Sequence, residues 1–310
     1  MSKKNLRRKL LLGSLCLILG FNSACSYVNI EDNEGEFIDP KESSSETEES
    51  QETPTSKESN NGFNIFKPRF DLNKHLEALP KTYDPYIKDA SDEAKLIYKE
   101  TESKFDELSQ KQAKRNPAVQ EFLVRTLLKH PEKIAEEYAK APTEEPFPEN
   151  RLKYYSQWDQ RWAFKEYAGG YFGQTGCGPT VLSMIYTTLS GDTSMTPDKM
   201  GEFSEQNGYA VPEAGTAWAL MKDGAISLGL NSQELPLDKN IIMNNLNEGK
   251  YVVLIMGPGD FTSTGHFIIL HDIKDGEFMV YDPFTIDNNY HSWSYEQIKD
   301  QIKNIWAISK

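Results

Sequence analysis

The chain has few cysteines and no long hydrophobic run, and each absence excludes a class of protein. Three cysteines among 310 residues are too few for a disulfide-stapled scaffold. No stretch of about 18 apolar residues occurs, so the sequence lacks an ordinary transmembrane helix. The patterns HExxH, GxxxxGK[ST] and GxGxxG and clustered Cys/His ligands are also missing, which argues against a metallopeptidase and a nucleotide-phosphate site.

A net positive charge is missing as well. The chain has 34 Lys+Arg against 47 Asp+Glu, for a formal net charge of −13. A protein that binds nucleic acid normally carries a basic patch, so we expect no nucleic-acid partner. The charge is unevenly distributed: residues 1–25 contain five basic and no acidic side chains, whereas residues 26–66 contain eleven acidic residues and two lysines.

Residues 1–25 have the features of a secretory signal, because a basic stretch is followed by an apolar one over 10–21. Small residues before Cys25 resemble a bacterial lipoprotein box, which predicts that Cys25 is lipidated. Asn22 departs from the aliphatic residue usual in that box, so plain secretion or an uncleaved anchor is the alternative. Cys16 would be removed with the signal. We therefore expect a membrane-anchored lipoprotein on the extracellular face of a bacterium, or a protein secreted into the cell wall.

Residues 26–66 predict an acidic, disordered linker, because they offer almost no apolar surface to offset the loss of chain entropy. Its expected role is that of a spacer between the anchor and a folded domain.

Residues 67–150 predict a small all-α segment without a chemical motif. Ser91, Asn116 and Pro131 have the features of helix starts. An apolar stripe follows the first start and predicts one continuous helix through Ile97, Thr101, Phe105 and Leu108. The segment has two histidines, expected to be surface or capping residues, His75 and His130. We interpret the segment as either a partner-binding module or an inhibitory pro-segment.

Residues 151–310 contain all five tryptophans and Cys177. Cys177 lies in a glycine-rich turn at 173–180, before an apolar stretch over 181–189 that predicts a buried helix ending at Gly191. The unpaired N–H groups and the dipole at a helix N-terminus stabilise a thiolate, which is how a nucleophilic cysteine is usually placed. The flanking glycines would let a substrate carbonyl approach. The alternative is that Cys177 is a small buried hydrophobic residue.

A thiolate nucleophile needs a base and a residue that orients the base. Strands are predicted at 251–256, 266–271 and 277–282, with a turn at 274–276 between the last two. His266 and Asp282 then lie at neighbouring strand ends away from the turn, where the carboxylate can hold the imidazole. The other two histidines of this region are predicted to be surface residues, His271 and His291.

Five ordered motifs in residues 151–310 resemble the peptidase C39-like group, relatives of the bacteriocin-leader-processing peptidases within the papain-like superfamily. They are YSQWDQRW at 155–162, TGCGPT at 175–180, GTAW at 215–218, GPGDFTSTGHF at 257–267 and DP at 282–283. The resemblance implies an α+β papain-like fold, with a Cys-bearing helix packed on an antiparallel sheet that carries His and Asp. It implies no metal or cofactor. The resemblance implies that Cys177 is the nucleophile and His266 the base. It also implies that Asp282 orients the base and that Gln157 supplies the oxyanion-hole side chain.

Gln174 is a rival for the oxyanion-hole role, because it is nearer to Cys177 in the sequence. The leader-processing relatives are fused to an ABC exporter, and this chain shows neither spanning helices nor a phosphate loop, so their double-glycine specificity is not expected here. The sequence thus predicts a surface-tethered or secreted cysteine hydrolase that cleaves peptide bonds of a peptide or protein substrate. The alternatives are an inactive papain-like binding module and a peptidoglycan amidase or transpeptidase.

Overall fold

The computed structural model describes residues 70–148 and 152–310, here called the helical unit and the sheet unit. The predictions of a signal, a lipidated cysteine and a disordered linker lie outside these ranges. The helical unit contains five short α-helices: α1 (Leu72–Ala78), α2 (Asp92–Thr101), α3 (Glu107–Arg115), α4 (Gln120–Arg125) and α5 (Pro131–Tyr138).

All three predicted helix starts are present. The Ser91 hydroxyl accepts a hydrogen bond from the Ala94 N–H at the start of α2, at 3.3 Å. Asn116 caps the 3-10 turn Pro117–Val119, which leads into α4, and Pro131 is the first residue of α5. The expected continuous helix through the apolar stripe is wrong, because α2 ends at Thr101. The Asp106 carboxylate accepts from the Ser109 N–H at 2.8 Å and starts α3 as a separate helix.

The sheet unit is built on one six-stranded antiparallel sheet in the order β5-β10-β6-β7-β8-β9. The three predicted strands are present as β6, β7 and β8, and β7 runs three residues beyond its expected end. Asp275 and Gly276 have φ of 53° and 80° in the turn between β7 and β8, as a two-residue hairpin turn with two left-handed residues requires. The strands are β5 (Asn231–Glu234), β6 (Tyr251–Met256), β7 (His266–Lys274), β8 (Glu277–Tyr281), β9 (Ser292–Trp293) and β10 (Ile302–Ser309).

Shorter elements and helices complete the sheet unit. Two small hairpins pair β1 (Glu166–Tyr167) with β2 (Gly170–Tyr171) and β3 (Ala210–Val211) with β4 (Gly215–Thr216). The helices are α6 (Phe172–Thr175), α7 (Cys177–Ser190), α8 (Pro197–Gln206), α9 (Ala225–Ser227), α10 (Lys239–Asn247) and α11 (Tyr295–Ile298), with a π-helical turn at Leu220–Gly224.

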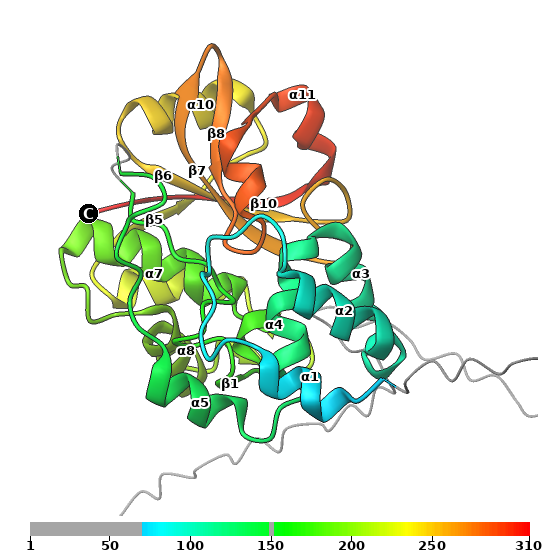
Figure 1. The fold of residues 1–310 in the computed structure, drawn as a ribbon. Coiled ribbons are helices and arrows are strands. Elements are labelled where there is room, and N and C mark those ends of the chain that lie inside the picture. The colour runs from blue at the N-terminus through cyan, green and yellow to red at the C-terminus, as the bar shows by residue number, and fades with distance from the viewer. Residues whose placement is uncertain (1–69, 149–151) are drawn as a thin grey trace, which may run out of the picture.

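Both faces of the sheet are covered, and alternate residues of the central strands enter two different apolar clusters. Phe267 and Ile269 of β7 belong to the cluster that contains α7, and Ile268 and Leu270 belong to the cluster that contains α10. The helix that begins at Cys177 therefore packs directly on the strand that begins at His266 (Figure 1). This is the mixed helix-and-sheet architecture that the sequence predicts.

A third apolar cluster joins the two units. Phe122 of α4 is fully buried in it, together with Trp158, Phe164 and Phe284 of the sheet unit. The buried Asn116 side chain donates to the Phe284 carbonyl at 2.8 Å across the same contact. Figure 1 shows α2, α3 and α4 lying against the sheet unit rather than apart from it. Within the described ranges, no helix has the length and apolar character needed to cross a membrane.

The prediction of a surface histidine at position 271 is only partly right, because the residue is half-buried and its ring faces inward. The His271 ring lies 4.3 Å from the Tyr281 ring, and both of its nitrogens are buried. Burial lowers the pKa of His271 from 6.5 to about 4, and the nearby Asp272 carboxylate offsets only part of this effect. The cause is the length of β7, which continues past His271 through a register shift between Leu270 and Asp272. His291 is exposed, as expected.

Candidate active site

His266 and Asp282 are in direct contact. The His266 Nε2 lies 2.6 Å from the Asp282 Oδ1, and both side chains are buried. Their positions follow from the hairpin: His266 is the first residue of β7, and Asp282 directly follows the last residue of β8. Because Nε2 is directed at the carboxylate, Nδ1 is the ring nitrogen that is available to exchange a proton with another group.

Asp282 is held by more partners than the sequence suggests. Its Oδ1 also accepts from the Phe284 and Thr285 N–H groups at 2.8 and 3.1 Å, and its Oδ2 accepts from the Asn288 side chain at 2.7 Å. The Asn289 side chain in turn accepts from the Asp282 N–H at 2.6 Å. These donors fix the direction of the carboxylate toward the imidazole. The two asparagines were not among the predicted site residues, although a pair of asparagines six and seven residues after an Asp-Pro is a visible signal.

A tyrosine supports the same strand end. The buried Tyr154 hydroxyl donates to the Asp282 carbonyl at 2.8 Å. Burial, followed by the Asp282 charge, raises the pKa of Tyr154 well above its usual value, so the hydroxyl keeps its proton and remains a donor.

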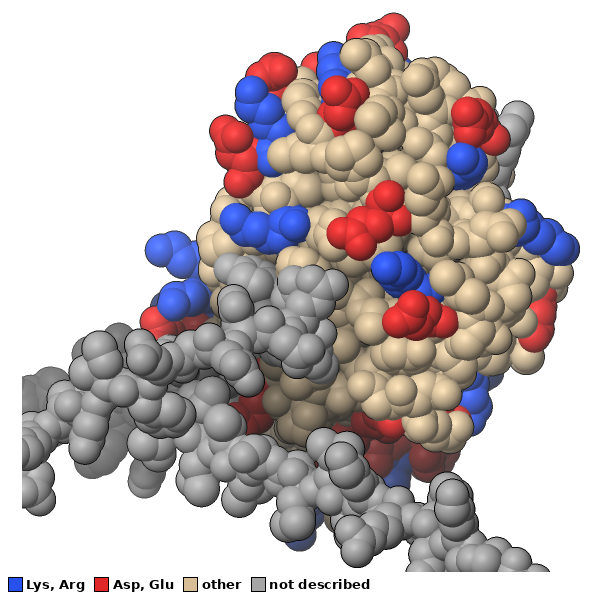
Figure 2. Space-filling model, turned by 180° about the vertical axis from the view of Figure 1, so that it is seen from behind, with Lys and Arg blue, Asp and Glu red and all other residues tan. Residues whose placement is uncertain are grey.

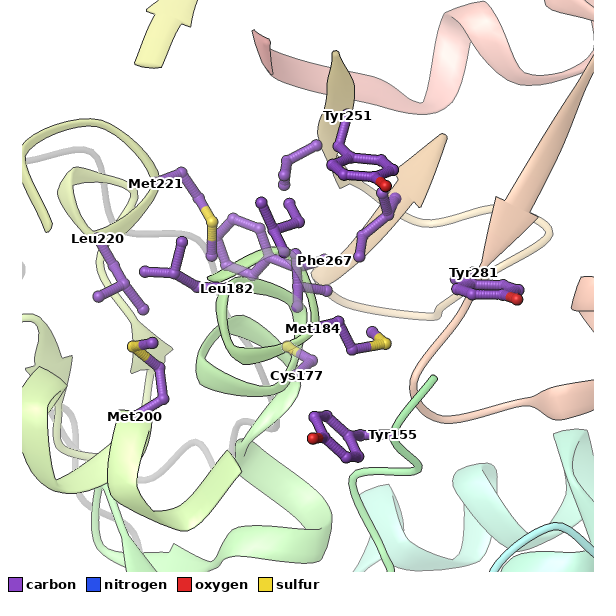
Figure 3. Close-up of a cluster of buried hydrophobic side chains, with 14 of the residues drawn as sticks. Tyr155, Cys177, Leu182, Met184, Met200, Leu220, Met221, Tyr251, Phe267 and Tyr281 are labelled. Atoms are coloured by element: carbon purple, nitrogen blue, oxygen red, sulfur yellow. The ribbon is translucent and has the colours of Figure 1, made fainter. Parts of the chain in front are cut away.

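Cys177 is the first residue of α7 and is fully buried in the apolar cluster around that helix. Figure 3 shows this cluster, with Cys177 at the beginning of the helix and Tyr155 near the same end. The helix continues to Ser190 and ends at Gly191, where φ is 79°, as the sequence predicts. A nucleophilic role for Cys177 requires the reduced thiol, because the thiolate is the nucleophile.

The glycines on either side of Cys177 have a packing role, which is separate from the predicted role in substrate access. A Cβ on Gly176 would lie 2.5 Å from the Phe172 ring, and one on Gly178 would lie 2.7 Å from the Thr216 side chain. Both distances are too short for any side chain, so these glycines let α6 and β4 pack closely around the helix start. Close packing therefore requires glycine at both positions.

Gln157 connects the two parts of the site. Its backbone N–H donates to the Pro283 carbonyl at 2.8 Å, next to Asp282. Its side-chain Nε2 donates to the Gly173 carbonyl at 3.0 Å, four residues before Cys177. The side chain of Gln174 is engaged differently, since its Nε2 donates to the Ser109 hydroxyl of α3 at 2.8 Å.

Gln157, Gln174 and His266 line one cavity of about 30 Å³, which has room for one or two water molecules. Cys177 is not among the described residues that line it. A histidine fixed by a buried carboxylate can accept and return a proton, and the amide groups beside it can donate to a developing negative charge. No group of three or more His, Cys, Asp or Glu side chains suited to a metal ion occurs in the described ranges.

Residues 149–310 match the model of the peptidase C39-like family, and because the match covers just over half of the chain, the protein belongs to this family. A similar solved structure is the peptidase domain of Streptococcus ComA, described as a bi-functional ABC transporter involved in a quorum-sensing pathway. It is 15% identical, with a TM-score of 0.34, and the alignment covers 44% of this chain and 93% of that one. The search of curated proteins gave no match. Family membership supports a cysteine peptidase as the class of this protein.

Proposed function

We propose that the protein is a cysteine hydrolase that cleaves peptide bonds, with Cys177 as nucleophile, His266 as base and Asp282 as the residue that orients the base. The observation that carries the proposal is the buried contact of 2.6 Å between His266 and Asp282. The packing of α7 on β7 supports it, because that packing places the helix that begins at Cys177 against the strand that begins at His266.

The proposed reaction has two halves. The reduced Cys177 sulfur, after giving its proton to His266, attacks the amide carbon, and a C–S bond forms. The C–N bond then breaks, and His266 transfers the proton to the leaving amine. In the second half, His266 takes a proton from water, the hydroxide attacks the thioester, and the C–S bond breaks to release the carboxylic acid and regenerate the thiol. Asp282 stabilises the imidazolium that is present in each half.

Gln157 is the better candidate for the oxyanion hole. Its backbone N–H donates to the Pro283 carbonyl beside Asp282, and its side-chain Nε2 donates to the Gly173 carbonyl on the approach to Cys177. The side-chain nitrogen of Gln157 carries two protons, and only one of them is used by the Gly173 carbonyl. The other can donate to the oxyanion, with the Cys177 backbone N–H as the second donor. The Gln174 amide is instead drawn toward Ser109 of the helical unit. Gln157→Ala should therefore reduce kcat more than Gln174→Ala does.

The first test is Cys177→Ala in the presence of a reducing agent. We expect the variant to lose iodoacetamide labelling at position 177 and all casein cleavage while melting near the wild-type temperature. Mass spectrometry of the labelled protein and a fluorescent casein assay give the two readouts, with purified cell wall as a second substrate. Full activity of the variant contradicts the proposal. Absence of labelling in the reduced, folded wild type points to a binding module, and release from cell wall alone points to an amidase.

We also propose that this activity is located outside the cell membrane, as the leader at 1–25 and the acidic segment at 26–66 predict. Mass spectrometry of the mature N-terminus tests this: a diacylglyceryl group on Cys25 supports tethering. An unmodified N-terminus after cleavage supports secretion.

A further inference from the structure

The helical unit forms one wall of the cavity beside His266. Four residues of α3 line it, opposite a loop that runs from Phe261 to Gly265 into β7. Arg115 of α3 crosses to this loop and donates through Nη1 to the Gly259 and Asp260 carbonyls at 2.8 and 2.7 Å. The lining residues from α3 are Leu108, Lys111, Gln112 and Arg115.

The charge around this cavity is opposite to that of the chain. Among the described residues that line the cavity, Lys111 and Arg115 are cationic and none is a carboxylate, although the chain has a net charge of −13. On the face shown in Figure 2, by contrast, basic and acidic side chains are interspersed and neither sign forms a continuous patch. The mouth of the cavity therefore favours an anionic group.

Both cations can take a further partner. Lys111 is paired at 2.7 Å with Glu107, but the side chains are 56% and 83% exposed, and such a surface pair is readily exchanged. Arg115 is exposed and uses Nη1 for the loop carbonyls, while a guanidinium has five N–H donors in all. A carboxylate at the mouth would therefore receive charge-assisted hydrogen bonds from α3.

The interior of the cavity presents unpaired acceptors. The side-chain oxygens of Gln112 and Gln157 are buried and have no hydrogen-bond partner among the described residues. Both residues line the cavity, and Gln157 is only 1% exposed. A buried acceptor without a donor is costly, and a water molecule is a donor that fits a cavity of this volume.

From these contacts we infer that α3 is a substrate subsite, and that it selects peptides with a carboxylate side chain near the cleaved bond. The carboxylate lies between Lys111 and Arg115 at the mouth of the cavity, and a water molecule inside it can donate to Gln112 and Gln157. This inference rests on the proposed peptidase function, and it makes the helical unit part of the substrate-binding surface instead of an inhibitory pro-segment.

The test uses three fluorescein-labelled decapeptides of one Gly/Ala/Leu sequence that differ only in a central Glu, Gln or Lys. Binding to full-length Cys177→Ala is measured by fluorescence anisotropy, because this variant needs no turnover. We expect the Glu peptide to bind about threefold to tenfold more tightly than the Gln peptide, and the Lys peptide to bind most weakly. The preference should shrink when the ionic strength is raised.

Substitutions in the Cys177→Ala background assign the preference to α3. Lys111→Ala should reduce it, and Lys111→Glu should reverse it in favour of the Lys peptide. The matched control is Lys114→Ala, since Lys114 is an exposed lysine of the same helix that does not line the cavity. The Lys114→Ala variant should prefer the Glu peptide as strongly as the Cys177→Ala parent does.

Three outcomes overturn the inference: equal binding of the three peptides, no binding of any of them up to millimolar concentration, or an unchanged preference in Lys111→Glu. Failure of the peptidase function is a separate result, because it is seen as absence of thiol labelling and casein cleavage in the reduced wild type. Charge-selective binding without turnover would retain the subsite and reject the reaction.

Discussion

The helical unit and the sheet unit differ in how they bury apolar surface. The sheet unit fills two clusters whose fully buried members all come from its own residues. The helices of the other unit are only six to ten residues long, and their buried side chains enter one cluster that also needs Trp158, Phe164 and Phe284. Helices this short are marginal without tertiary packing. The helical unit therefore depends on the sheet unit, whereas the sheet unit has cores of its own.

The strongest test of this comparison is to separate the units. We expect residues 70–148 alone to show no cooperative unfolding by circular dichroism, because their shared cluster loses one wall. Residues 152–310 alone should retain a cooperative transition at a lower temperature than the joined protein, with added exposure of apolar surface detected by ANS. A cooperative transition in the isolated helical unit would show that it is an independent domain.

A single side chain at the junction should have the next largest effect. Phe122 is fully buried, and its ring lies 5.2 Å from that of Phe164 in the sheet unit. Phe122→Ala should lower the free energy of unfolding by about 3–5 kcal/mol, measured by urea denaturation.

Leu96→Ala is the matched control for this substitution, because Leu96 is an apolar residue of α2 that is 39% exposed. It should change stability by about 0.5 kcal/mol or less. A similar loss in both variants would mean that the junction is not a tightly packed core.

The sequence predicts a helix end, a turn or a strand well where a few neighbouring residues determine it. The apolar run over 266–271 and the Asp275–Gly276 turn identify β7 and β8, and the hairpin between them brings His266 to Asp282. The start of α7 and its end at Gly191 are equally local signals. The family motifs then lead to the correct family.

Contacts between distant segments are what the sequence does not show. β10 was not predicted, although it lies in the middle of the sheet between β5 and β6. Arg115 reaches carbonyls 144 and 145 residues away, and no local pattern indicates that a surface arginine will meet that loop. The apolar stripe through Phe105 predicts one helix, but the Asp106 cap starts α3 as a separate helix.

The buried histidine of the sheet unit gives a smaller test, which depends on pH. With a pKa of about 4 in the folded state and 6.5 in the unfolded chain, His271 is protonated only after unfolding between these values. The unfolded state then binds more protons, so this residue's contribution to stability is retained above pH 6.5 and lost as the pH falls toward 4. The loss between pH 7 and pH 4.5 is about 2 kcal/mol.

His271→Phe keeps an aromatic ring against Tyr281 and removes the titrating group. Urea denaturation measures the free energy of unfolding at pH 7 and at pH 4.5. The fall between the two pH values should be smaller in the variant than in the wild type, by about 2 kcal/mol. His291→Gln is the control, because His291 is exposed and should leave the pH dependence unchanged. The helical unit supplies a further contrast, since its His75 pairs with the Glu93 carboxylate at 2.7 Å, whereas His271 packs against Tyr281. If His271→Phe and wild type lose stability in parallel, the histidine is not buried in its neutral form, and the acid sensitivity of the protein must come from its carboxylates.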